Sequence, residues 1–397
     1  MKKIAIVTHC IANNYGANLQ ALSTACYLKN KQYEPVFITW GDYLSNNTPL
    51  EQVEIHSTFL KKNGFIVSEP CHTDQDFLNV IDDYNIQNII VGSDCVLTYK
   101  SSYSPYKLTR KGITKVTIPK DYDFPNPFWL PYLKGRKEIK RFLLSASCGG
   151  GEIGRISKSI QKEMHDLISC FDYISVRDTF THHFLHEIAP ENIINLTPDP
   201  VFGFNHNFKE IPSEEEIKRK FNLPEDYLII SFYRHNWPDQ VWANKLKEEA
   251  HKYNYSCIGI PMPQGGRNSS FDINLELPLD PIDWYSLIKH SKGYIGNNMH
   301  PIIVAIHNGV PFFSYNIHGQ SILRNRIQLL WTSKEYDLLK RWGLEKNLVP
   351  QPIINWISPK HVIKSIIKFD KKRLVEVSAQ MKSEYLSMMD EITNHFI

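Results

Sequence analysis

A histidine at the start of an apolar helical segment has the surroundings of an anion-binding or proton-transferring group. His300 lies in the run NNMHP at 297–301, between a predicted strand at 293–296 and a predicted helix at 301–307. Proline favours the first position of a helix, so this pattern places His300 at the N-cap. Unpaired N–H groups and the helix dipole attract phosphate or carboxylate there, and imidazole titrates near neutral pH. His300 and the neighbouring Asn298 are therefore candidate anion-site residues, and a structural histidine is the alternative.

Two arginines follow predicted strands, at the edge of a parallel sheet where ligands usually bind. Arg234 ends the predicted strand 227–233, and Arg177 follows the strand 173–176. A guanidinium can bind a carboxylate or phosphate through two parallel hydrogen bonds, so both arginines are candidates for holding an anionic ligand. The alternatives are an ion pair between Arg234 and a surface carboxylate, and a tie between the two halves of the chain through Arg177.

Two polar turns at the same expected edge could orient a polar ligand. The first includes Asn14, Tyr15 and Gly16 and leads from the predicted strand 4–9 into a helix. The second includes Ser93 and Asp94, after the predicted strand 88–92. The alternatives are a helix cap at the first turn and an Asx turn at the second.

Other motifs give no support for a bound cofactor or metal. A GxGxxG pattern at 149–154 lies in the fourth strand–helix unit, whereas a dinucleotide-binding turn belongs to the first. His182, His183 and His186 have helical spacing without a partner carboxylate or Cys nearby, which favours a solvated helix face over a metal site. The seven cysteines include no CxxC pair and indicate reduced thiols of a cytosolic protein.

The composition is that of a folded protein of two or three domains. With 397 residues, 42% of them hydrophobic and 22% charged, general disorder is excluded. A net charge of +3 gives no reason to expect nucleic acid as a partner. No apolar run reaches the roughly 18 residues of a spanning helix, and the short N-terminal run lacks a cleavage site. We therefore expect a cytoplasmic protein whose membrane contact is at most peripheral.

Short apolar segments alternate with helical ones, which predicts an α/β fold with parallel sheets covered on both faces. Strands are predicted at 4–9, 35–40, 88–92, 142–147, 173–176, 227–233, 256–260, 293–296 and 311–315. Helices are predicted at 18–28, 157–170, 179–187, 213–221, 240–252, 281–290 and 301–307.

A proline-rich, aperiodic stretch at 198–212 suggests a domain boundary. We predict an N-terminal Rossmann-like domain at 1–205 and a C-terminal one at 206–350, facing each other across a cleft. Helices at 351–397 are expected to pack back across both domains. The segment 97–141 is an insertion in the first domain, and its aromatic residues form either a stacking surface for a ligand or ordinary packing. These aromatic residues are Tyr103, Tyr106, Trp129 and Tyr132.

Taken in order, the landmarks of the chain resemble those of the polysaccharide pyruvyltransferase family. They are NNYGANLQAL, VGSD, SASCGGG, ISVRD, PDP and IGNNMHPIIVAIHNGVPFF, and the resemblance extends from residue 1 to about 345. Cys95 and Leu97 stand where the family usually has Gln and Trp. Asn298 and Met299 stand where it often has Ser-Arg or Ser-Phe. The resemblance implies a fold similar to that of GT-B glycosyltransferases.

The resemblance also implies a reaction, in which pyruvate passes from phosphoenolpyruvate to two hydroxyls of a sugar and forms a cyclic ketal. The sugar would belong to a polysaccharide or its lipid-linked precursor, and no metal or other cofactor is implied. His300 matches the family's histidine, as acid–base group or phosphate ligand, and Arg234 matches an arginine associated with donor binding. Beside them we assign Asn298 and Arg177 to the donor. To the acceptor we assign Asn14, Tyr15, Gly16, Ser93 and Asp94.

Two other functions stay open from the sequence. A glycosyltransferase of similar fold would need a nucleotide-binding carboxylate, for which Glu276, Asp280 and Asp283 are available. A non-catalytic binding member of the family would fit the departures at Cys95, Leu97 and Met299. With a lipid-linked acceptor, the basic stretches 107–120 and 360–373 would attract the protein to the inner face of the cytoplasmic membrane. A homo-oligomer is compatible with each of these functions.

Overall fold

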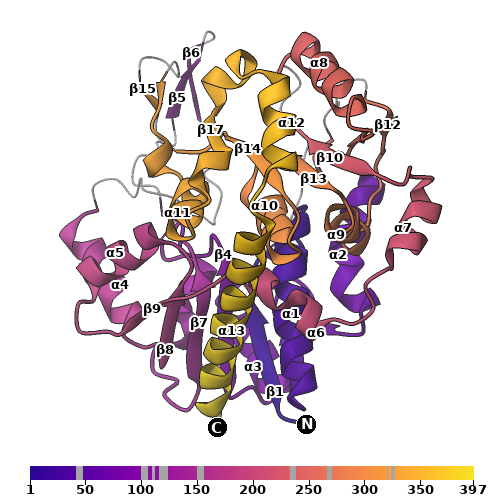
Figure 1. The fold of residues 1–397 in the computed structure, drawn as a ribbon. Coiled ribbons are helices and arrows are strands. Elements are labelled where there is room, and N and C mark those ends of the chain that lie inside the picture. Colours follow the sequence, from indigo (N-terminus) through magenta and orange to yellow (C-terminus); the bar gives the residue numbers. More distant parts are fainter. Residues whose placement is uncertain are drawn as a thin grey trace.

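Two parallel sheets organise the chain (Figure 1). The computed structural model describes residues 1–41, 48–99, 106–109, 112–115, 124–149, 156–232, 238–265, 271–319, 321–322 and 327–397. In spatial order, the first sheet contains β3 (Ile66–Val67), β2 (Glu34–Phe37), β1 (Lys3–Val7), β4 (Asn88–Asp94), β7 (Lys140–Ala146), β8 (Tyr173–Val176) and β9 (Ile194–Leu196). The second contains β12 (Ile273–Asn274), β11 (Ser256–Gly259), β10 (Tyr227–Ser231), β13 (Gly293–Gly296), β14 (Phe312–Asn316) and β17 (Leu348–Pro350). Neighbouring strands in both sheets are parallel, so the carboxyl ends within each sheet share one edge.

Helices connect the strands and cover the sheets. Those of the first half are α1 (Tyr15–Asn30), α2 (Leu50–Lys62), α3 (Asp74–Asp83), α4 (Lys158–Ile168), α5 (Thr179–Ile188) and α6 (Phe204–Asn207). Those of the second half are α7 (Glu214–Phe221), α8 (Gln240–His251), α9 (Pro281–Lys289), α10 (Met299–His307), α11 (Lys334–Arg341), α12 (Pro359–Ile367) and α13 (Lys371–Asn394). Two short antiparallel pairs complete the described strands, β5 (Tyr106–Thr109) with β6 (Gly112–Lys115) and β15 (Ser321–Ile322) with β16 (Ile327–Gln328).

The predicted α/β class is confirmed, and each of the nine predicted strands and seven predicted helices has a counterpart within a few residues. The sequence analysis missed α2, α3, α6 and α11, the two antiparallel strand pairs, and the edge strands β3, β9, β12 and β17. These edge strands have only two or three residues each. Such short segments carry too little hydrophobic alternation to be recognised.

Apolar side chains alternate between the two faces of each sheet, as expected for strands buried on both sides. In β1, Ile4 and Ile6 belong to one core and Ala5 and Val7 to another. The core that contains Ile4 also includes side chains of α1, α9, α10, α13 and the second sheet. One continuous apolar core therefore joins the two sheets.

The last long helix lies against both halves of the molecule. Figure 1 shows α13 running in front of the sheets, and its Tyr385 is fully buried. A Cβ at Gly203 would lie 2.1 Å from the Tyr385 ring, so the absence of a side chain there admits the tyrosine. The Tyr385 hydroxyl accepts a hydrogen bond from Asn207 at 3.0 Å, and Asp390 pairs with Lys31, the C-cap of α1, at 2.7 Å. The chain thus returns from the second sheet to the first.

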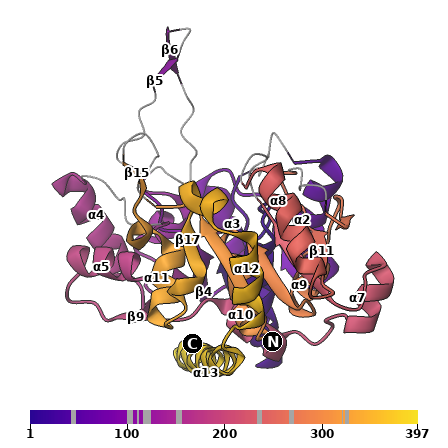
Figure 2. The same ribbon diagram turned by 45° about the horizontal axis from the view of Figure 1, so that its top comes forward.

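The insertion at 97–141 is described only in part. Within it, β5 and β6 stand apart from the two sheets (Figure 2). Trp129 is 1% exposed in the core of the first half, and Tyr132 stacks on Trp40 at 5.6 Å. Both aromatic rings are packing residues of the first half. Tyr103 lies outside the described residues, and the side chain of Tyr106 is not among the described ones.

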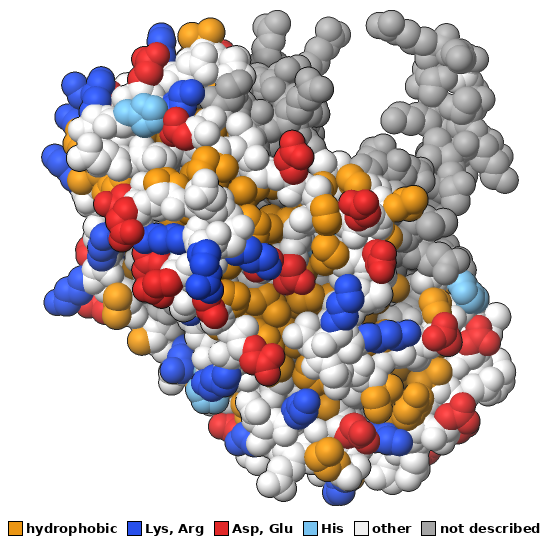
Figure 3. Space-filling view, turned by 90° about the vertical axis from the view of Figure 1, so that its right-hand side faces the viewer, with side chains coloured by type: hydrophobic (Ala, Val, Ile, Leu, Met, Phe, Trp, Pro, Cys, Tyr) orange, Lys and Arg blue, Asp and Glu red, His pale blue; other side chains and the backbone are white. Residues whose placement is uncertain are grey.

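The described surface carries mixed charge. On the face shown in Figure 3, Lys and Arg side chains are interspersed with Asp and Glu, in keeping with a net charge of +3. Among the described helices, none combines the length and the apolar character needed to cross a bilayer.

Candidate active site

A cavity of about 610 Å³ lies where the carboxyl ends of strands from both sheets approach each other. It receives residues from the loops that follow β1, β4, β11, β13 and β14, from the first turns of α1 and α10, and from α9 and α11. This is where an open parallel sheet places its ligands. The residues that line it are His9, Ala12, Asn13, Asn14, Tyr15, Gly16, Asp94, Cys95, Thr98, Met262, Pro263, Gln264, Trp284, Asn298, Met299, His300, Pro301, Ile317, His318 and Lys334.

The start of α1 forms one wall of the cavity. Asn14 is its N-cap, and the side-chain oxygen accepts hydrogen bonds from the N–H groups of Gly16 at 3.0 Å and Ala17 at 3.3 Å. The helix cap considered for this turn is therefore present, and Asn14 also lines the cavity. Tyr15 is 2% exposed and stacks on Trp284 of α9, with ring centroids 5.1 Å apart.

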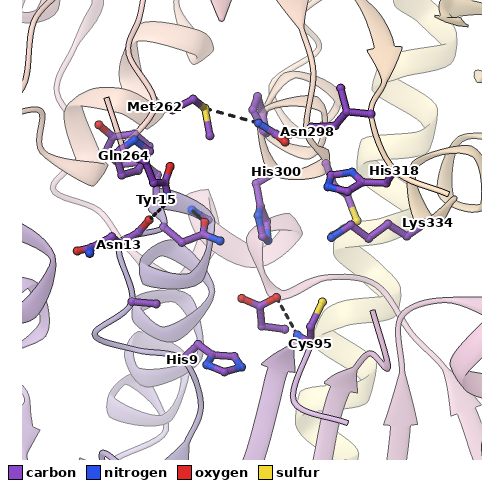
Figure 4. Close-up of a pocket in the computed structure, with 18 of the residues that line it drawn as sticks. His9, Asn13, Tyr15, Cys95, Met262, Gln264, Asn298, His300, His318 and Lys334 are labelled. Atoms are coloured by element: carbon purple, nitrogen blue, oxygen red, sulfur yellow. Dashed lines mark hydrogen bonds between the residues drawn. The ribbon is translucent and has the colours of Figure 1, made fainter. Parts of the chain in front are cut away.

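His300 lies directly against Gly16. A Cβ added to Gly16 would be 2.0 Å from Cγ and 2.2 Å from Nδ1 of the imidazole. The ring therefore occupies the space that any other residue at position 16 would fill. Figure 4 shows His300 pointing from α10 into the cavity, between Tyr15 on one side and Lys334 on the other.

The start of α10 differs from the expectation. The helix begins at Met299 and its N-cap is Asn298, so His300 is the second helical residue and Pro301 the third. Proline is tolerated there because the N–H groups of the whole first turn lack helical partners. Asn298 has φ of 77°, and its own side chain makes no cap hydrogen bond. The Asn298 amide instead lies 3.5 Å from the Met262 sulfur (Figure 4), so the N-cap side chain leaves the first N–H groups of α10 uncapped at the cavity.

A buried ionic network supports the floor of the cavity. Arg177, 3% exposed, donates from Nη2 to Asp94 at 3.1 Å and from Nη1 to Asp199 at 2.9 Å. Burial alone would raise the pKa of the Asp94 carboxyl, but Arg177 and His300 hold it well below its usual range. Arg177 therefore holds two carboxylates and does not line the cavity.

Burial lowers the pKa of His300 below its ordinary value, and Asp199 and Asp94 offset part of that effect. The Nε2 atom of His300 is buried without a hydrogen bond, 3.9 Å from Oδ2 of Asp199. At neutral pH the imidazole is accordingly neutral and able to accept a proton.

A lysine that the sequence analysis did not select also lines the cavity. Lys334 is the first residue of α11, whose N-cap is Ser333. Burial acts to lower the pKa of Lys334, but Cys95 and Glu335 outweigh it and the pKa lies above its ordinary value. No carboxylate of the described residues forms an ion pair with its ammonium group. The ammonium group of Lys334 and the first turn of α10 line the same cavity, so the end of the cavity near Lys334 is suited to bind an anion.

The predicted site residues fall into three groups. Asn14, Tyr15, Gly16, Asp94, Asn298 and His300 line the cavity. Ser93 and Arg177 lie behind its wall, where the Ser93 hydroxyl donates to the Ser145 carbonyl at 2.8 Å. Arg234 lies outside the described residues.

Two further sequence motifs contribute no described residue to the cavity. The glycine-rich turn at 149–154 lies mostly outside the described residues. Contrary to the sequence analysis, His183 has a partner carboxylate, Glu187 at 3.2 Å, and both side chains are exposed on α5, as expected for a solvated helix face. Within the described ranges, no group of three or more His, Cys, Asp or Glu side chains is arranged to hold a metal ion.

The fold and the position of the cavity define a GT-B-like protein, with two facing α/β halves. The chain is similar to the S. aureus MnaA–UDP co-structure, with a TM-score of 0.50, 12% identity, and 97% of this chain and 91% of that chain covered. It is also similar to UDP-GlcNAc 2-epimerase from Methanocaldococcus jannaschii, with a TM-score of 0.51, 10% identity, and 96% and 93% covered. At such low identity these similarities establish the fold alone.

The sequence matches the polysaccharide pyruvyl transferase family model over residues 14–319, and the chain belongs to this family. The matched region includes every predicted site residue, from Asn14 to His300, while Lys334 lies beyond it. A search of curated protein sequences finds no significant match.

Proposed function

We propose that the protein transfers pyruvate from phosphoenolpyruvate to two hydroxyls of one sugar, forming a cyclic ketal and releasing inorganic phosphate. The observation that supports this proposal is the set of groups that line one cavity in a member of this family. The cavity combines the imidazole of His300, the ammonium group of Lys334 and the uncapped start of α10.

The donor has two anionic groups, a phosphate and a carboxylate, and therefore needs two subsites rich in positive charge or N–H groups. Lys334 and the first turn of α10 are our proposed subsites, because charge-assisted hydrogen bonds to these groups are stronger than neutral ones. We keep Arg234 as a further donor ligand and Asn298 as a residue that shapes the turn beside it.

The reaction requires several proton transfers. A proton added to the methylene carbon of the donor makes the adjacent enol carbon electrophilic, and the first sugar hydroxyl attacks it and gives up its proton. The bond from that carbon to the phosphate oxygen then breaks, and the second hydroxyl attacks and gives up its proton. Of the two protons released, one balances the proton placed on the methyl group and the other leaves on inorganic phosphate. A group that titrates near neutral pH is suited to these transfers, and His300 is our assignment. No step of this scheme calls for a metal or a nicotinamide.

The acceptor sugar is assigned to the opposite end of the cavity. Figure 4 shows Asn13, Tyr15 and Gln264 on the side of His300 away from Lys334. Gln264 donates to the Asn13 carbonyl at 3.0 Å, which joins the two sheets across this end. Amide groups and aromatic rings suit a sugar, which has hydroxyls on its edge and C–H groups on its faces. We place the reaction in the cytoplasm, at the inner membrane face when the acceptor is lipid-linked.

Of the three carboxylates considered for a nucleotide sugar, Glu276 does not line the cavity, and the other two have other roles in the structure. Asp280 caps α9 by accepting a hydrogen bond from the Ile282 N–H at 2.8 Å, and Asp283 pairs with Lys220 at 2.7 Å. Neither of them lines the cavity. These contacts favour phosphoenolpyruvate over a nucleotide sugar as the donor.

The proposal is tested by incubating the protein with phosphoenolpyruvate and a panel of oligosaccharides, followed by mass spectrometry of the intact products. One oligosaccharide should gain the mass of pyruvic acid less one water, with one phosphate released per product. His300→Gln should lower kcat by about 10²- to 10⁴-fold, the usual contribution of general acid–base catalysis. Turnover of nucleotide sugars with none of phosphoenolpyruvate would overturn the proposal in favour of a glycosyltransferase.

Removing the charge of Lys334 should mainly weaken donor binding. Lys334→Gln is expected to raise the KM for phosphoenolpyruvate by about 10- to 100-fold, because a hydrogen bond to a charged group contributes roughly 1.5–3 kcal/mol. Lys334→Arg should recover part of the loss. Lys340→Gln, at an exposed position of the same helix, is the matched control and should leave KM unchanged. Equal KM values in the two glutamine variants would remove Lys334 from the donor site.

A further inference from the structure

Asp199 is a fully buried carboxylate that collects donors from several elements. It follows β9 and caps a short 3-10 turn at Pro200–Gly203, where its Oδ1 accepts the Val201 N–H at 3.0 Å. Its other oxygen, Oδ2, accepts hydrogen bonds from Gln20 at 2.5 Å and from Arg177 at 2.9 Å. The side chain is 0% exposed, so substrate cannot reach it directly.

The same oxygen faces the imidazole of His300. The distance from Asp199 Oδ2 to His300 Nε2 is 3.9 Å, and Nε2 is buried without a hydrogen bond. An unpaired polar atom in such a place costs free energy, and a shift of about 1 Å would close the contact to hydrogen-bond length. The opposite ring nitrogen, Nδ1, lies beside Gly16, which lines the cavity. One nitrogen therefore faces the buried carboxylate, while the other lies next to a residue that lines the cavity.

We propose that Asp199 is a positioning residue for His300: it holds the imidazole with the proton on Nε2 and leaves Nδ1 to accept a proton from the attacking sugar hydroxyl. The inference rests on the proposed function for the identity of the substrate, and on geometry alone for the pairing of the two residues. The hydroxyl proton moves to Nδ1 as the oxygen–carbon bond forms, and the resulting imidazolium carries its positive charge next to the Asp199 carboxylate. After the phosphate has left, the proton on Nδ1 passes to the released phosphate, and the imidazole is neutral again.

Other charged groups face His300 as well, and their charges also act on the pKa of its imidazole. Asp94 adds a second negative charge, whereas Arg177 and Lys334 add positive charge. Asp94 and Arg177 already pair with each other at 3.1 Å. Lys334 lies on the far side of the imidazole from Tyr15 (Figure 4). Among the described residues, Asp199 is the carboxylate that lies within 4 Å of an imidazole nitrogen, at 3.9 Å from Nε2. Removing its charge should therefore change the pKa of His300 more than it changes the packing around the ring.

A merely structural Asp199, serving only to neutralise Arg177, would give different results. In that case nothing would favour the tautomer of the neutral imidazole that is protonated at Nε2. A neutral residue at position 199 would then change the stability of the protein but not the pKa of His300. A hydrogen-bonding partner fixes the tautomer of a histidine. The tautomer is therefore the most direct measurement.

The first experiment uses the wild-type protein with ¹⁵N-labelled histidine, and His300→Gln identifies the His300 signals. Nitrogen chemical shifts should report a neutral ring protonated at Nε2, and its titration should give a pKa below the ordinary value. A ring protonated at Nδ1 would overturn the proposal. This measurement needs no substrate and no variant at Asp199, so it decides the pairing even if the protein makes no ketal.

The second experiment uses Asp199→Asn, which keeps the shape of the side chain and removes its charge. The NMR titration of His300 should move down by about one pH unit, because an opposite charge at about 4 Å shifts a pKa by roughly 1–3 units. The acid limb of kcat/KM should move by the same amount, and kcat should fall about tenfold while the KM for phosphoenolpyruvate changes little. Gln20→Met is the matched control, because it removes another partner of Asp199 without changing charge, and it should leave both titrations in place. An unmoved titration in a folded Asp199→Asn protein would contradict the proposal. If the His300 titration shifts in Asp199→Asn but the wild-type protein makes no ketal, the pairing of the two residues stands and the proposed function is refuted.

Discussion

Gly16 and His300 bring the two halves into direct contact at the cavity. Gly16 is in the first turn of α1, and the imidazole comes from α10. A side chain at position 16 would overlap the ring, so the glycine determines where the histidine can lie. The glycine assigned to the acceptor from the sequence therefore has a more immediate role, in seating the proposed catalytic residue.

Gly16→Ala is expected to reverse the usual effect of alanine in a helix. Alanine normally stabilises a helical position by roughly 0.5–1 kcal/mol relative to glycine. Here it should lower the free energy of unfolding by about 1–3 kcal/mol through overpacking, and displacement of the ring should lower kcat by about 10²-fold. Urea unfolding and steady-state kinetics measure the two effects.

A second variant, His300→Ala, tests whether the imidazole causes the loss of stability expected for Gly16→Ala. In a His300→Ala background, Gly16→Ala should recover the ordinary stabilisation, because the ring that it would strike is gone. The coupling between the two substitutions in a double-mutant cycle measures that contact. Additive effects would mean that Gly16 and His300 do not interact.

At the scale of elements, a buried histidine connects α2 to the loop that opens the cavity. His56 is 0% exposed, and its Nδ1 lies 2.5 Å from the Asn18 side-chain oxygen. The Gln52 amide lies 2.9 Å from Nε2, and the Asn18 amide donates to the Cys10 carbonyl at 2.9 Å. Asn18 can only accept through its oxygen and Gln52 can only donate through its nitrogen, so His56 is neutral with its proton on Nδ1. Protonation of Nε2 would break the contact with Gln52.

Stability should therefore decline in mild acid. Burial lowers the pKa of His56 to about 4, against 6.5 in an unfolded chain. Between these values the unfolded state binds more protons than the folded state, so the free energy of unfolding falls as the pH drops from about 6.5 towards 4. The contribution of His56 is about 3 kcal/mol at the acid end. Urea midpoints over this pH range measure it.

His56→Gln removes the titration and should flatten the pH dependence by that amount. His183→Gln, at a position whose side chain is 75% exposed, is the control and should leave the pH dependence as it is. If His56→Gln lost stability with falling pH as steeply as the wild type, the acid sensitivity would have another source.

The sequence predicted the elements of the site better than the contacts among them. The loops after β1 and β4 were expected at one edge because parallel strands share their carboxyl ends, and the loop after β13 was expected across the cleft in the second domain. Asn14, Asp94 and His300 do line one cavity. Lys334 was missed because a lysine after a serine has no local pattern that separates it from a surface residue. The pairing of Gln20 with Asp199 joins residues 179 positions apart, and only tertiary packing brings them together. The start of α10 was misplaced by two residues because proline is tolerated at more than one position of a first turn.

At the scale of the whole molecule, one apolar core between the sheets and a helix that lies on both halves hold the cavity together. Tyr385 of α13 is the centre of that contact, buried over Gly203 and bonded to Asn207. Tyr385→Ala should lower the free energy of unfolding by about 3–5 kcal/mol, the usual cost of removing a buried aromatic ring. Tyr385→Phe should cost about 1 kcal/mol, because Asn207 keeps its bonds to Ser23.

Val375→Ala on the same helix is the matched control, since Val375 is 62% exposed and its removal should change stability by less than about 0.5 kcal/mol. Urea unfolding with a single transition would also show that the halves unfold together. If Tyr385→Ala were no more destabilising than the control, α13 would not be part of the cooperative structure.

The close contact between His300 and Gly16 restricts which hybrid proteins can be made from the halves of related chains. A hybrid that takes its first sheet from this protein and its second from a relative inherits the glycine from one parent and the imidazole from the other. Its interior can accommodate many exchanges of apolar side chains at constant volume, but the ring must still meet a residue without Cβ. Such hybrids should therefore be recovered as folded proteins more often than as active enzymes, and compensating substitutions should collect around positions 16 and 300.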